Sequence, residues 1–158
     1  MDGAMLATIW LALAGYVVGE GAKTWHRRSG VDPRWGWAVS LAGLTACIAH
    51  IVLAMAYRHG WSHQAALQET ARQTSGVYGL SWGGGLYVNY LFVAVWLAEL
   101  AWWRSDPGGF RQRGPGVVWA VRIFAAVIVF NAAVIFAAPD RRVAGAAVVA
   151  ALVASWFW

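Results

Sequence analysis

The chain has 158 residues, of which 60% are hydrophobic and only 12% are charged. Soluble domains carry about 25% charged residues, so this composition excludes an ordinary soluble fold and indicates lipid as the main solvent. The twelve tryptophans agree, because indole rings favour the bilayer interface. The net charge of +5 predicts no nucleic-acid partner, since no basic run alternates with aromatics and most Lys and Arg residues lie in short loops.

Five apolar segments follow one another along the chain, and a helix needs roughly 20 such residues to cross a hydrocarbon core of about 30 Å. The first lacks a basic n-region and a small-residue cleavage site, so we expect a retained helix rather than a signal peptide. The last is short: a brief fifth span is our prediction, and an interfacial or re-entrant helix is the alternative. The segments cover residues 4–22, 35–57, 86–103, 117–138 and 143–158.

The longest polar stretch is residues 58–85, between the second and third apolar segments. Ser62 is a suitable helix N-cap, and residues 64–74 are mostly good helix formers. They predict a short helix on the outer membrane surface, or a lid over the bundle. The glycine run 83–85 allows a sharp bend or a close backbone approach, with a flexible helix entry as the simpler interpretation.

The predicted fold is therefore an all-α integral membrane protein in a single domain, a bundle of four to five transmembrane helices with a short outer surface helix. Loops 23–34 and 104–116 hold seven Lys and Arg residues, against four in the other two loops. The positive-inside rule then places these two loops in the cytoplasm, and the N-terminus and residues 58–85 outside. A bacterial inner (plasma) membrane is the expected location.

Three of the four histidines lie together in the sequence, near the outer end of the second span. His50 is roughly 10 Å deep at 1.5 Å per residue, and His59 and His63 follow at i, i+4 spacing. Because neutral imidazole is a common metal ligand, the three are candidate ligands of a transition metal or a haem. The alternative is structural, with His50 bonded to a neighbouring helix and the other two solvated. None of the specific ligand motifs is present.

Other polar residues lie inside the predicted spans, where burial is costly. Asn89 and Asn131 approach the outer half and could form a polar patch with His50. Glu99 and Arg122 have matched depths near the inner end, which predicts an ion pair between neighbouring helices. Glu20 could join that pair or extend to the interface.

Small residues and the single cysteine lie within the apolar segments. Gly15 and Gly19 form a GxxxG that would let helices approach closely, within the chain or between chains. Cys47 lies in an apolar stretch and is interpreted as a small hydrophobic residue. A further stripe of small residues on the last segment comprises Ala146, Ala150 and Ala154.

No motif points to a known family or to catalysis, so we expect a protein that is not an enzyme. The leading prediction is an accessory, assembly or scaffold subunit of a membrane complex, with lipid and other membrane subunits, or further copies of itself, as partners. The first alternative is a haem- or metal-binding redox protein that uses His50, His59 and His63. The second is an oligomeric small transporter or channel in which the intramembrane polar residues line the path of the transported molecule or ion.

Overall fold

The computed structural model describes residues 2–157, and no strand occurs among them. Its long helices are α1 (Asp2–Ser29), α2 (Arg34–Tyr57), α4 (Gly85–Ser105) and α6 (Pro115–Phe130), and α6 continues as the π-helical turn η1 (Asn131–Ile135). The shorter elements are α3 (His63–Tyr78), α5 (Pro107–Gln112), the 3-10 turn η2 (Pro139–Arg141) and α7 (Arg142–Ser155).

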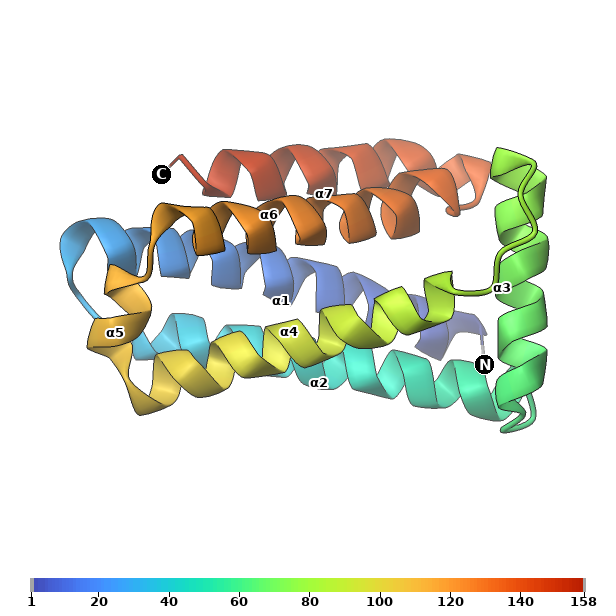
Figure 1. Cartoon of the computed structure of the whole chain (residues 1–158), viewed down its shortest axis with the longest axis horizontal. Coiled ribbons are helices and arrows are strands. Elements are labelled where there is room, and N and C mark those ends of the chain that lie inside the picture. Colours follow the sequence, from blue (N-terminus) through green and yellow to red (C-terminus); the bar gives the residue numbers. More distant parts are fainter. Residues whose placement is uncertain (1, 158) are drawn as a thin grey trace.

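The long helices run along one common axis, with α3 lying across one end of the bundle and α5 at the opposite end (Figure 1). We refer to these as the α3 end and the α5 end. Four segments are long and apolar enough to cross a membrane: Gly3–Ser29, Arg34–Tyr57, Gly85–Ser105 and Pro115–Ile135. The predicted all-α bundle with a surface helix is confirmed.

The last apolar segment forms α7, which lies along the bundle and packs against α1, α6 and η1 (Figure 1). Its 14 residues span about 21 Å at 1.5 Å per residue, less than a hydrocarbon core. Gly145 makes the close contact, because a Cβ there would lie 1.8 Å from the carbonyl oxygen of Ala133. The alanine stripe of the sequence prediction is exposed on this helix.

Helices α1 and α2 approach each other through glycines. A Cβ on Gly15 would lie 2.6 Å from the Cα of Gly43, and one on Gly19 would lie 2.6 Å from the Oγ of Ser40. The GxxxG of α1 therefore serves packing within the chain. Close backbone approach of this kind is what small residues permit at helix interfaces in membranes.

The first helix is longer than predicted, because residues 23–29, assigned to a loop, continue it. Lys23, Thr24 and His26 are buried there rather than solvated. Helix continuation is possible because the bundle supplies partners for these side chains. The fourth apolar segment, by contrast, leaves helical geometry after Ile135, three residues before its predicted end.

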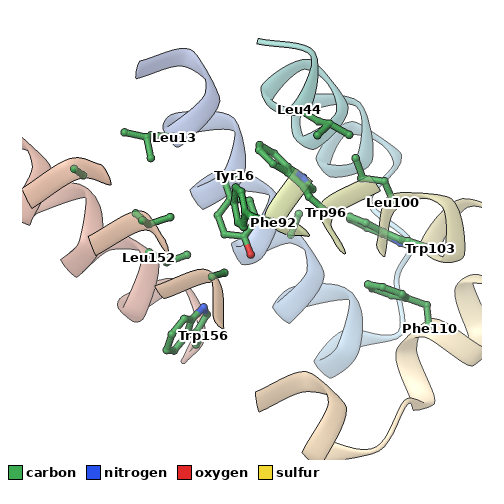
Figure 2. Packing of buried hydrophobic residues seen from close by; sticks show 14 residues of the cluster. Leu13, Tyr16, Leu44, Phe92, Trp96, Leu100, Trp103, Phe110, Leu152 and Trp156 are labelled. Atoms are coloured by element: carbon green, nitrogen blue, oxygen red, sulfur yellow. The ribbon is translucent and has the colours of Figure 1, made fainter. Parts of the chain in front are cut away.

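Aromatic side chains fill the centre of the bundle. The Tyr16 and Trp96 rings meet edge to face with centroids 4.8 Å apart, and Trp96 Nε1 donates to Ser40 Oγ at 2.9 Å. Trp103 stacks on Phe110 with ring planes 7° apart, which fixes α5 against α4. Figure 2 shows Tyr16, Trp96 and Trp103 among the buried residues of this core.

Helix α3 begins after Ser62, as its sequence predicts, but ends at Tyr78, four residues beyond the predicted segment. The Ser62 hydroxyl accepts from Ala65 N at 3.1 Å, and Gly79 closes the helix with a left-handed φ of 69°. At the far end, Tyr78 donates to Asn131 Oδ1 at 2.6 Å, which ties α3 to η1. The glycine run packs closely rather than flexibly, since a Cβ on Gly83 would lie 2.7 Å from the Leu67 carbonyl oxygen.

Candidate functional site

A polar cavity of about 810 Å³ opens at the α3 end, which we call the outer cavity. Helix α3 provides much of one wall, and the ends of α2 and α4 provide the others. Its volume lies within the usual range for small-molecule sites. The polar and charged residues in its lining are His50, Arg58, His59, Gln68, Glu69, Thr70, Arg72, Gln73, Asn89 and Tyr90.

The charged part of this wall is locked in place on α3. Arg72 donates to both carboxylate oxygens of Glu69, at 2.8 and 2.6 Å, and Gln73 Nε2 adds a bond of 2.8 Å. These hydrogen bonds lower the pKa of Glu69 to about 2, so its carboxylate is ionised at neutral pH. An ion pair between Glu69 and Arg72, with the Arg72 side chain largely exposed, therefore lies in the wall of the outer cavity.

A second cavity of about 170 Å³, the inner cavity, lies deeper in the bundle. Its lining is almost wholly apolar and includes Phe92, Trp96 and Cys47. His50, Ile51 and Asn89 line both cavities, so they form the junction between the two spaces. The site thus consists of a polar chamber joined through a histidine and an asparagine to a small apolar one.

His50 is held at this junction by the start of α1. Its Nδ1 lies 3.0 Å from the Met5 carbonyl oxygen and 3.4 Å from Thr8 Oγ1. Because a carbonyl can only accept, the Nδ1–H tautomer is assigned from this contact, and the neutral ring then has Nε2 as its acceptor. His50 is therefore bonded to a neighbouring helix, as the structural alternative predicted, and the partner is the Met5 carbonyl oxygen of α1.

The three candidate histidines do not come together. His59 lines the outer cavity with His50, whereas His63 lies against Tyr87 and Tyr90, with Nε2 3.3 Å from the Tyr87 hydroxyl. The chain turns at Gly60, whose φ is 53°, so the i, i+4 spacing does not fall on one helix face. Among residues 3–157, whose side chains the structure describes, no three His, Cys, Asp or Glu side chains are grouped to hold a metal ion. The metal or haem alternative thus has no preformed three-histidine site.

A cluster of ionised side chains, the charge cluster, is buried toward the α5 end. Lys23 bridges two carboxylates: it pairs with Glu20 on its own helix and with Glu99 Oε2 of α4 at 2.7 Å. Arg113, just after α5, pairs with the other oxygen of Glu99. Each of these four side chains is at most 5% exposed, so the pairs compensate charge that would otherwise be costly in lipid.

The predicted Glu99–Arg122 pair is wrong. Glu99 binds Lys23 and Arg113 instead, and Arg122 donates to Thr24 Oγ1 at 2.6 Å, with its Nε 4.0 Å from Glu20 Oε2. Lys23 reaches Glu99 because α1 continues as a helix past residue 22. Glu20 does join the network, as expected. Lys23 was missed, although its i, i+3 spacing from Glu20 is a signal for a helical ion pair.

Tyr16 separates the inner cavity from the charge cluster. Its ring lines the inner cavity, and Lys23 Nζ lies 5.5 Å from the ring centroid on the cluster side. Asn131, the third member of the predicted polar patch, lines neither cavity: it donates to Val127 O and accepts from Tyr78. Of the three residues of that patch, only His50 and Asn89 line the same cavities.

Comparison with known protein families, with curated proteins and with solved structures finds no match to this chain. The chemistry of its site is therefore inferred from the geometry of this chain alone.

Proposed function

We propose that the protein is a membrane-embedded binding protein that takes a small amphipathic molecule from the side of the α3 end. The polar part of that ligand occupies the outer cavity and its apolar part the inner cavity. The observation that carries the proposal is the junction of the two cavities at His50 and Asn89.

The inner cavity sets the size of the apolar group. An apolar cavity of about 150 Å³ accommodates a benzene-sized molecule, so 170 Å³ suits one ring or a short branched chain. His50 Nε2 supplies an acceptor and the Asn89 amide both a donor and an acceptor at the boundary. These groups favour a ligand with a hydroxyl or amide next to its apolar end.

Binding fits the geometry better than conduction. Beyond Tyr16 the path meets the charge cluster, in which every ionised group is buried and paired. The cavities therefore end within the bundle. With the predicted orientation, the α3 end faces the outside of a bacterial inner membrane and the α5 end faces the cytoplasm, because the arginine-rich loops lie at the α5 end.

A saturable binding measurement tests this function. The probe is 4-fluorobenzyl alcohol, which has one ring and one hydroxyl, followed by fluorine NMR with the purified protein in detergent micelles. We expect saturable binding above the linear partitioning into protein-free micelles. Ala132→Phe, which fills the inner cavity from its wall, should weaken binding at least tenfold.

The matched control is Ala94→Phe, which places the same ring on the exposed surface of α4. It should leave the affinity unchanged. Partitioning that never saturates, or equal affinity in the Ala132→Phe and wild-type proteins, would contradict the proposal. The accessory-subunit function stays a prediction, and it is compatible with a ligand site in the same chain.

A further inference from the structure

A basic pocket of about 350 Å³ lies at the α5 end, between α1, α6 and the end of α7. Its wall includes Thr24, Arg27, Trp119, Arg122 and Trp156, and no carboxylate of the described residues lines it. It lies at the opposite end of the bundle from the outer cavity and shares no lining residue with either cavity of the proposed function.

The short contacts of the Arg122 guanidinium in this pocket are with neutral groups, and its one carboxylate contact among the described residues, with Glu20 Oε2, is 4.0 Å long. Its carbon lies 5.6 Å from the Trp119 ring centroid and 5.7 Å from that of Trp156, and Nη2 donates to Thr24 Oγ1. Arg27 likewise donates to a neutral group, the Arg113 carbonyl oxygen, at 3.3 Å. Neither bond compensates a positive charge.

The neighbouring charge cluster does not supply the missing negative charge. Three buried cations, Lys23, Arg113 and Arg122, face two buried carboxylates, Glu20 and Glu99. Glu99 is occupied by Lys23 and Arg113, and Glu20 is paired with Lys23, leaving Arg122 only a 4.0 Å contact. An excess buried cation is costly unless an anion approaches it.

A second, independent observation also points to an acceptor from outside the described residues. Trp156 is 92% buried, and its Nε1–H has no hydrogen-bond partner among them. A buried donor without an acceptor leaves its loss of hydration uncompensated, so such donors are rare. Trp156 lines the basic pocket, and its ring centroid lies 5.7 Å from the guanidinium carbon of Arg122.

We propose that the basic pocket binds a phosphate group, presented by the headgroup of an anionic membrane lipid. Phosphate offers several acceptor oxygens, which suit a guanidinium and an indole N–H together. The flanking tryptophans suit a membrane interface, and basic pockets between spanning helices are sites for anionic headgroups.

The test measures thermal unfolding of the detergent-purified full chain during titration with dioleoylphosphatidylglycerol. Parallel titrations use dioleoylphosphatidylcholine and inorganic phosphate. We expect phosphatidylglycerol to raise the unfolding midpoint saturably. Arg27→Gln should raise the half-saturating lipid concentration about fivefold, because it removes one positive charge from the wall next to the bound headgroup. Arg104→Gln, an exposed arginine at the same end outside the pocket, is the matched control and should change nothing.

Trp156→Phe keeps an aromatic ring, although a smaller one, and removes the indole N–H, so it tests the site if Arg27→Gln folds poorly. It should also raise the half-saturating concentration. If inorganic phosphate stabilises as well as the lipid, and Arg27→Gln weakens both, the phosphate site holds with a soluble source. Equal stabilisation by phosphatidylcholine, equal losses in Arg27→Gln and Arg104→Gln, or no effect of any phosphate compound would overturn it.

Discussion

At the scale of single residues, Glu99 makes two of the buried ion pairs. It alone joins α4 to both Lys23 of α1 and Arg113 beyond α5. The sequence indicated that Glu99 needs a partner, because a carboxylate at that depth is costly in lipid. It could not identify the partner, because three cations, Lys23, Arg113 and Arg122, are buried near this carboxylate. Which of them pairs with Glu99 depends on how the helices are rotated and on how the chain after α5 folds back toward α4.

Glu99→Gln should therefore destabilise the protein. The substitution leaves two buried cations with one fewer carboxylate, and breaking a buried pair from one side costs about 3–5 kcal/mol. Thermal or denaturant unfolding in detergent measures the loss. Glu69→Gln is the control: its ion pair is exposed to solvent and should contribute within about 1 kcal/mol. A Glu99→Gln loss no larger than that of Glu69→Gln would contradict the buried network.

At the scale of helices, the sequence predicted which segments are helical but placed some of their ends wrongly. Apolar length identified four spans, and Ser62 correctly marked the start of α3. The polar residues 23–29 were read as a loop because composition alone cannot show that Lys23 and His26 find partners inside the protein. Nor did apolarity reveal where helical geometry is lost, since residues 136–138, beyond the end of η1, are apolar as well.

The contact between α1 and α2 gives a prediction at this scale. Gly15→Ala places a methyl group 2.6 Å from Gly43 Cα, so the two helices must move apart, at a cost of about 1–3 kcal/mol. Gly76→Ala is the control, because that helical position has open space around it and alanine favours helix. Unfolding measurements should show a loss for the first and no loss for the second. Unchanged stability in Gly15→Ala would mean that these helices do not pack through their glycines.

At the scale of the whole molecule, the bundle has two different ends. The α3 end carries a polar cavity joined to an apolar one, and the α5 end carries paired charges and a basic pocket. The sequence indicated some of this division through its loop charges and its intramembrane His50 and Asn89. The outer cavity could not be foreseen, because it depends on how α3 folds back across the bundle. The inner cavity could not be foreseen either, because it depends on how α1, α2, α4 and α6 pack together.

The account depends most on the connection between the two cavities, and Cys47 provides a direct measurement. It lines the inner cavity and is the single cysteine of the chain, so mass spectrometry of its modification has no background. The reagent is the small water-soluble 2-aminoethyl methanethiosulfonate, applied to the protein in lipid nanodiscs. Asn89→Trp closes the junction, and Leu91→Trp, two residues along on an exposed face of α4, is its control.

Joined cavities predict that Cys47 is modified in the wild-type and Leu91→Trp proteins, and at least tenfold more slowly in Asn89→Trp. If the rate is the same in all three proteins, or if Cys47 is not modified in any of them, water does not reach the inner cavity through His50 and Asn89. Either result would contradict the account.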